Sequence, residues 1–171
     1  MDALNAILER RSIRAYTDEQ IPEEVTENLL RAGMYAPSAM NSQPWEFLVI
    51  REPGKKAAAS QLGRYWNMLR DAPLGILVMA NLKSYKASSR EFFIQDCSAA
   101  TQNILLAAHA QGLGAVWLGL YPKKDRMQGI RDIFGIPGDI IPFSLISIGY
   151  PAETKRPHRT FHEDKVHYDK Y

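Results

Sequence analysis

The sequence has 171 residues, of which 46% are hydrophobic and 23% are charged, proportions that are typical of one globular domain rather than of a disordered chain. Its 21 basic and 19 acidic residues leave a net charge of +2, which argues against nucleic acid as the main partner because phosphate binding needs a concentrated basic surface. Cys97 is the only cysteine, so no intramolecular disulfide can form, and without a signal-like start or a membrane-length apolar run this predicts a cytoplasmic protein.

Apolar periodicity predicts helices and strands that interleave along the chain. Helices are expected from Asp2 to about Arg10, from Pro22 past Leu30, over Gly54–Arg70 with an interruption at Gly63, over Arg90–Gln111, and over Pro122–Phe134. Strands are expected at Trp45–Arg51, at Leu74–Ala80 with both faces buried, at Ala115–Leu120, and at Ile140–Ile148 with an irregular or edge start at Pro142. This order predicts one layered α+β or α/β domain over residues 1–171, with an extended tail from about residue 150.

Several common catalytic patterns are missing from the sequence. It has no Walker loop, no GxGxxG, no GxSxG and no HExxH. Cys97 lies in an apolar helical pattern, where a cysteine is more often part of the core than a nucleophile. The histidines at 109, 158, 162 and 167 do not have metal-ligand spacing, so no metal site is predicted.

A cluster of arginines at Arg10, Arg11 and Arg14, with Ser12 between them, is the first segment with chemical potential. The planar fork of a guanidinium makes paired, charge-assisted hydrogen bonds to phosphate oxygens. The alternative is a solvated basic helix end that complements the helix dipole. On charge alone the second interpretation is favoured.

Two further segments could approach a flat ligand. In Ala36–Trp45, small residues allow close backbone approach, and Asn41 and Gln43 offer both donors and acceptors for the polar edge of a heterocycle. In Gly112–Gly119, the last glycine would let a ligand approach the backbone. Taken separately, each has an ordinary structural alternative, a turn before a strand or a glycine at a strand end.

Together and in this order, the segments resemble the nitroreductase family over nearly the whole chain. The resemblance is carried by RRSIRAY, APSAMNSQPW, GLGAVWLG, the GYPAE turn at Gly149–Glu153 and the basic tail after it. It implies an α+β fold, namely a three-layer α/β/α domain around a mostly antiparallel sheet. It also implies an intertwined homodimer with FMN at the interface, and no membrane or nucleic-acid partner.

The resemblance implies a cofactor-binding role for residues in four segments. One or more arginines of the first segment would bind the phosphate, and Arg14 would lie near N1 and O2 of the flavin ring as an electrostatic stabiliser. The loop after the second helix would come from the partner subunit, and basic tail residues, with Lys155 as a weaker candidate, would complete the phosphate site. The expected set is Arg10, Arg11, Ser12, Arg14, Pro37, Ser38, Met40, Asn41, Gln43, Trp117, Leu118, Gly119, Arg156 and Arg159.

The same resemblance implies ping-pong reduction of nitroaromatic, quinone or related acceptors by NADH or NADPH, with the chemistry at flavin N5 and no side-chain nucleophile. Alternatives are a flavin reductase, a reductive dehalogenase, a slow flavin-binding or redox-sensing protein, and a basic interaction module without cofactor. Gly119 stands where several relatives carry a glutamate, and the stretch between Leu82 and Arg90 is short. Both features bear on the choice of acceptor.

Overall fold

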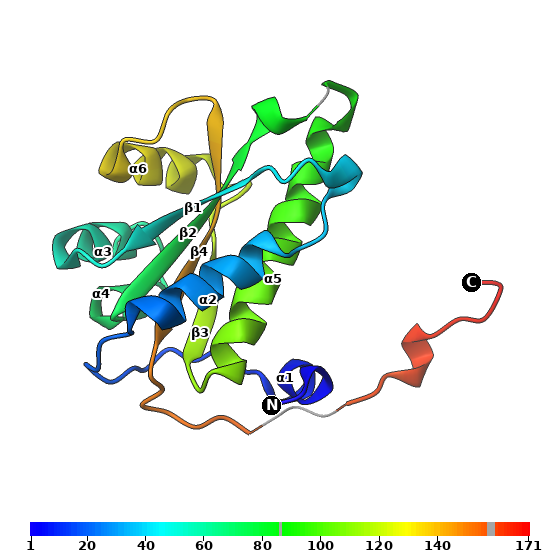
Figure 1. Cartoon of the computed structure of the whole chain (residues 1–171), viewed down its shortest axis with the longest axis horizontal. Coiled ribbons are helices and arrows are strands. Elements are labelled where there is room, and N and C mark those ends of the chain that lie inside the picture. Colours follow the sequence, from blue (N-terminus) through cyan, green and yellow to red (C-terminus); the bar gives the residue numbers. More distant parts are fainter. Residues whose placement is uncertain (86, 157–159) are drawn as a thin grey trace.

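A four-stranded antiparallel sheet organises the molecule, as Figure 1 shows. The structure, a computed structural model, describes residues 1–85, 87–156 and 160–171. The strands lie in the order β1-β2-β4-β3, and their bounds are β1 Trp45–Ile50, β2 Leu74–Asn81, β3 Gly114–Gly119 and β4 Ile140–Gly149. Each predicted strand is present to within about one residue.

Helices cover both faces of this sheet (Figure 1). On one face lie α2 and α5, and on the other lie α3, α4 and α6. Their bounds are α2 Glu23–Met34, α5 Phe93–Ala110, α3 Pro53–Ser60, α4 Met68–Asp71 and α6 Lys124–Phe134, while α1 is Ala3–Glu9 and 3-10 turns lie at Ala39–Asn41, Leu82–Ser84, Ala87–Phe92 and Glu163–Lys165. The three-layer α+β arrangement is therefore confirmed.

The central strand β2 supplies both hydrophobic cores, because successive side chains of a strand point to opposite faces. Ile76 and Val78 belong to the core beneath α5, whereas Leu77 and Met79 belong to the core beneath α6. Every residue from Leu74 to Ala80 is buried, so the prediction of a strand covered on both faces is confirmed.

The helix predicted over Gly54–Arg70 is interrupted around Gly63, as expected, but the break is longer than a single residue. Helix α3 ends at Ser60 and only one turn, α4, follows. The chain between them folds tightly around the buried indole of Trp66: a Cβ at Gly63 would lie 2.6 Å from that ring. This turn brings Arg64 and Tyr65 to the surface.

Pro142 lies in an interior strand, not an edge strand, but at an irregular point of it. The register between β2 and β4 shifts between Val78 and Met79, and Pro142 pairs with Met79 beyond the shift. Strand β3 ends opposite Ser144, so at Pro142 the strand has a neighbour on one side only. The missing N–H of proline is tolerated there.

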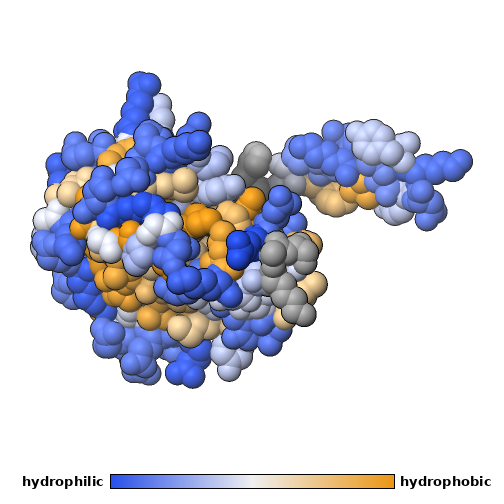
Figure 2. Space-filling model, turned by 90° about the horizontal axis from the view of Figure 1, so that it is seen from above, coloured by the Kyte–Doolittle hydropathy of each residue, from blue (hydrophilic) through white to orange (hydrophobic). Residues whose placement is uncertain are grey.

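Helix α5 packs its apolar face into the core of its own chain. Cys97 and Ile104 are fully buried, whereas Ile94 is 39% exposed, so only the last of these remains available for contact with a second subunit. Residues 160–171 are exposed and lie apart from the body of the molecule (Figures 1 and 2). Among the described residues, no helix is both long and apolar enough to cross a membrane.

Candidate functional site

The arginine-rich segment crosses the end of the sheet where β3 begins and β4 ends. Ser12 forms a parallel bridge with Ala115, and the amide of Ile13 donates to the carbonyl of Ala115 at 3.1 Å. The amide of Arg14 donates to Glu153 Oε1 at 2.5 Å. These backbone bonds fix the segment, so its side chains project from a defined position.

A cavity of about 290 Å³ adjoins this segment at the end of α5. Arg11, His109 and Lys155 line it, and two buried nitrogens, Arg11 Nη2 and His109 Nε2, have no hydrogen-bond partner within the described chain. Burial, followed by the charge of Arg10, lowers the pKa of His109. Burying the guanidinium nitrogen of Arg11 without a partner is costly, and an oxygen of a bound anion would satisfy it.

The tail after β4 closes part of the same region. The Nε atom of Arg11 donates to the carbonyl of Arg156 at 3.0 Å, and Lys155 Nζ donates to the carbonyl of Ser12 at 2.8 Å. The amide of Arg14 and the ammonium of Lys155 hold the pKa of Glu153 below its ordinary value. The tail and the first segment thus meet at one place, as expected. Arg159 lies outside the described residues.

A second cavity, of about 440 Å³, is lined by Arg14. The other lining residues come from the turn around Trp66, namely Arg64, Tyr65, Asn67 and Met68. Arg126 Nη1 donates to the carbonyl of Gly119 at 3.0 Å, and the same guanidinium lies 5.3 Å from the ring centroid of Trp66. The end of β3 therefore lies beside the turn that lines the Arg14 cavity.

The three residues of the β3 segment face different environments. Trp117 packs beside Phe143 in the core beneath α5, with the ring centroids 6.0 Å apart, and Leu118 is 3% exposed in the opposite core. A Cβ at Gly119 would meet no atom within 4 Å. A ligand at this end of β3 would therefore touch the backbone of Leu118, not its side chain, and would have open space at Gly119.

The Pro37–Pro44 loop lies at the other end of α5 (Figure 1). Its Ala39 amide donates to the carboxylate of Asp96 in the first turn of that helix, at 3.1 and 3.2 Å to the two oxygens. His109 is in the last turn, and a rise of 1.5 Å per residue separates the two side chains by roughly 20 Å along the axis. Within one chain, the loop does not meet the Arg10–Arg14 segment.

A comparison with models of protein families identifies the family of this chain. The model described as "Nitroreductase family" matches residues 7–62 and 53–150. The chain belongs to the nitroreductase family. A protein of Methanothermobacter thermautotrophicus, whose provisional name pairs NADH dehydrogenase with NAD(P)H nitroreductase, is 46% identical over 100% of this chain and 88% of its own.

Solved structures agree with this nitroreductase assignment. The FMN-dependent nitroreductase of Clostridium difficile R20291 is 29% identical, with a TM-score of 0.90 over 98% of this chain and 99% of its own. A protein of Desulfovibrio desulfuricans crystallised in complex with FMN is 33% identical, with a TM-score of 0.85 over 100% of this chain and 98% of its own. The expected family and fold are confirmed.

Three positions of the chain were not singled out from the sequence. Asn67 joins the Arg14 cavity only through the turn around Trp66, so no local pattern indicated it. His109 faces the 290 Å³ cavity because α5 ends beside Arg11. Asp96 could have been found from the sequence, since an acidic residue within the apolar helix pattern at Ile94–Leu105 is unusual and implies a polar partner.

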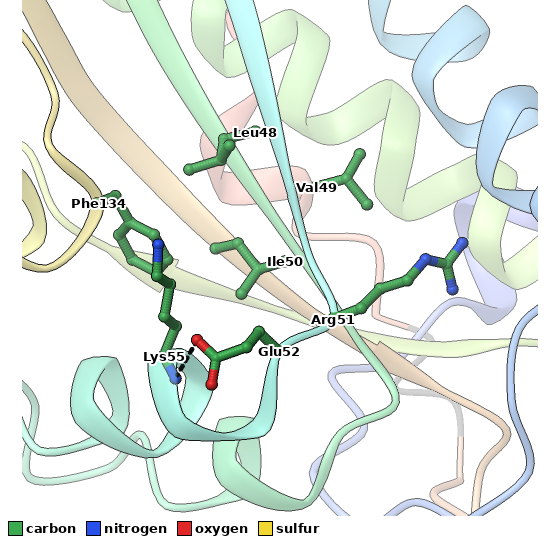
Figure 3. A pocket seen from close by; sticks show the side chains of 7 residues that line it. All are labelled: Leu48, Val49, Ile50, Arg51, Glu52, Lys55 and Phe134. Atoms are coloured by element: carbon green, nitrogen blue, oxygen red, sulfur yellow. Dashed lines mark hydrogen bonds between the residues drawn. The ribbon is translucent and has the colours of Figure 1, made fainter.

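A third cavity, of about 240 Å³, lies at the outer edge of β1 (Figure 3). Leu48, Ile50 and Phe134 form its apolar wall, and the ammonium of Lys55 lies 5.7 Å from the ring centroid of Phe134. It contains no predicted site residue, and nothing about it indicates redox chemistry. The described residues also contain no group of three or more side chains that could hold a metal ion.

Proposed function

We propose that this chain is an FMN-dependent oxidoreductase that takes electrons from NADH or NADPH and passes them to nitroaromatic, quinone or related electron-poor acceptors. The observation that carries the proposal is the pair of cavities beside Arg10–Arg14. One contains the unpartnered guanidinium nitrogen of Arg11, which suits a phosphate oxygen, and the other presents Arg14 with space for a ring. The family and the FMN-bound relative from Desulfovibrio desulfuricans support it.

The donor set fits the two ends of FMN. Arg11, with Arg10 and Lys155 nearby, would bind the phosphate, because guanidinium and ammonium groups make charge-assisted bonds to its oxygens. Arg14 and Asn67 would face the polar edge of the ring. Arg156 would bind through its main chain or side chain, while the role of Arg159 stays a prediction from the sequence.

Bound FMN would supply the hydride chemistry, so the protein needs no nucleophile of its own. The role of this chain is to position and to stabilise charge. Arg14 has no carboxylate partner for its side chain among the described residues, because Glu153 accepts from the Arg14 amide and pairs with Lys155. Its guanidinium is therefore available to stabilise negative charge in the cavity. Because donor and acceptor would use the same open side at Gly119, ping-pong exchange is part of the proposal.

A homodimer is part of the proposal as well. The Pro37–Pro44 loop is roughly 20 Å from the first segment along α5, so a loop that touches the flavin has to come from a second chain. Three apolar side chains of α1 also need cover: Leu4 is 64%, Ile7 55% and Leu8 50% exposed. Apolar faces of this kind mark interaction surfaces.

The test begins with an absorbance spectrum of the purified protein and its sedimentation. A yellow dimer whose flavin is bleached anaerobically by NADH or NADPH is the expected result. A colourless chain, or an FMN-loaded monomer, would refute the shared site. Bound flavin that neither nicotinamide reduces would identify a flavin-binding or sensing protein without turnover.

The acceptor is identified by steady-state assays with nitroarene, quinone, free FMN and oxygen. Flavin reduction is the second candidate, because the backbone at Gly119 is open, with no atom within 4 Å of an added Cβ, and the FMN reductase [NAD(P)H] of Bacillus subtilis is 24% identical over 91% of this chain. Faster turnover with free FMN than with nitroarenes and quinones would favour that candidate.

A further inference from the structure

A buried carboxylate without a positive partner lies at the base of the Pro37–Pro44 loop. Asp96 is only 5% exposed, and the described residues place no basic side chain within ion-pair distance of it. Burying an ionised carboxylate is costly unless hydrogen bonds compensate. A core position in an apolar helix would otherwise be filled by an apolar residue.

The partners of Asp96 come from two different segments. Both of its oxygens accept from the amide of Ala39 at 3.1 and 3.2 Å, and Oδ2 also accepts a short hydrogen bond from the hydroxyl of Tyr85. Burial and the neighbouring carboxylate raise the pKa of Tyr85, so its hydroxyl stays a donor at neutral pH. Asp96 therefore ties the loop to the segment that follows β2.

The loop that Asp96 holds has an unusual backbone. Met40, Asn41 and Gln43 have φ angles of 53°, 52° and 45°. Asparagine adopts this left-handed region more readily than most residues, but methionine and glutamine rarely do unless surrounding contacts enforce it. Ser38 Oγ accepts from the amide of Gln43 at 3.0 Å and helps to close the turn. Met40 is 75% exposed at the tip.

We propose that Asp96 is a positioning residue that holds the Pro37–Pro44 loop in the shape in which it covers the flavin bound to the other chain of the dimer. This inference rests on the proposed function. It adds a residue outside the loop that acts through the amide of Ala39. Strained backbone at a ligand-binding loop is maintained by such contacts.

The segment after β2 is the second element held by Asp96. Tyr85 is 6% exposed, and Ser89, from the following 3-10 turn, is 2% exposed with its Oγ 3.5 Å from the sulfur of Met40. The loop tip thus rests on the same segment that Tyr85 ties to Asp96. Loss of the carboxylate would free both segments together.

The first experiment compares FMN binding by dialysed and reconstituted full-length variants. Asp96→Ala is expected to weaken FMN binding by about tenfold or more, since a charge-assisted hydrogen bond to a buried group is lost, and to change the visible circular dichroism of the bound flavin. Asp96→Asn keeps one acceptor oxygen for Ala39 and should recover part of the affinity. Tyr85→Phe should have a smaller effect of the same kind.

Thr101→Val is the matched control. Thr101 is fully buried on the same helix, and its hydroxyl lies 2.8 Å from Ser144 Oγ, but it does not touch the loop. This variant is expected to lower the melting temperature and to leave the FMN dissociation constant unchanged. Weakening by Thr101→Val equal to that by Asp96→Ala would overturn the inference, because general loosening of α5 would then explain both.

A mixed dimer provides the sharper test. When an Asp96→Ala chain pairs with an Arg14→Ala chain, one site combines an intact Arg14 with an intact loop, and the other site carries both defects. Differently tagged chains, purified as the mixed pair, should bind about half the FMN of the wild type at a concentration where neither variant homodimer is loaded. Failure to recover this tight half-occupancy would overturn the action of Asp96 on the partner's site.

The outcomes separate this inference from the proposed function. A colourless wild-type protein that cannot be reconstituted would overturn both. A yellow wild type together with an Asp96→Ala variant of unchanged FMN affinity and unchanged flavin circular dichroism would overturn only the role of Asp96.

Discussion

Adding one methyl group at Gly114 should displace the arginine-rich segment from β3. A Cβ there would lie 2.6 Å from Ile13 Cγ2 and 2.7 Å from Ile13 Cβ, roughly 1 Å inside normal carbon–carbon contact. Rotation of the Ile13 side chain cannot relieve the second contact, and Ile13 is 9% exposed. The segment has to move, which weakens the 3.1 Å bond from its amide to the carbonyl of Ala115. Overpacking of this kind costs about 1–3 kcal/mol.

Two measurements follow for Gly114→Ala. At about 2–4 °C per kcal/mol for a chain of this size, the cost above predicts that the apo protein melts roughly 2–12 °C lower. Because the arginines move with the segment, the FMN dissociation constant should rise by about tenfold for each 1.4 kcal/mol. Gly138→Ala is the control, since a Cβ there meets nothing within 4 Å. Unchanged FMN affinity and melting temperature in Gly114→Ala would refute the idea that this close contact positions the segment.

Three other outcomes are expected. Arg14→Gln should lower the flavin reduction potential by about 30–60 mV, which is a solvent-screened fraction of the Coulomb energy between adjacent charges. Arg14→Lys keeps the positive charge and should leave the potential close to that of the wild type. A redox titration of each variant against a reference dye measures the difference. Arg64 lines the Arg14 cavity, and Arg126 binds the backbone of Gly119 beside it. Because both guanidiniums would attract an anionic acceptor, Arg64→Gln and Arg126→Gln should each lower kcat/KM several-fold for 4-nitrobenzoate but little for 4-nitrobenzyl alcohol. Cys97, whose pKa burial raises to about 12, should react with iodoacetamide at pH 8 only after denaturation, and rapid labelling of the native protein would contradict its burial.

The strands were predictable because each is an apolar run with a clear end. Pro73 precedes β2 and Gly149 ends β4, and such residues interrupt regular structure wherever they occur. In the helix predicted over Gly54–Arg70 the break at Gly63 was expected, but the length of that break has a tertiary cause. Its amphipathic pattern is real, but the chain turns there to enclose the indole of Trp66, and periodicity contains no information about which side chain the turn will enclose.

The candidate site was predictable in its segments and not in its geometry. Arg11 and Arg14 belong to a segment that was singled out from the sequence, and each lines a cavity. Nothing local indicated that the two cavities are different, because that division comes from the segment crossing β3 and not from its composition. Asn67 and His109 join the cavities through turns and helix ends that are distant in sequence. Their roles as cofactor ligands stay predictions.

Helix α5 separates the two parts of the proposed site within one chain. Its middle is fixed in the core by fully buried residues such as Cys97 and Ile104, so its two ends cannot approach each other. Asp96 at one end accepts from the Ala39 amide of the Pro37–Pro44 loop, and His109 at the other end faces the 290 Å³ cavity. A helix acts as a rigid spacer of 1.5 Å per residue. The sequence elements that resemble one flavin site are therefore held roughly 20 Å apart, and in the proposed dimer a second copy, placed with its loop over the first chain's Arg14 cavity, would bring them together.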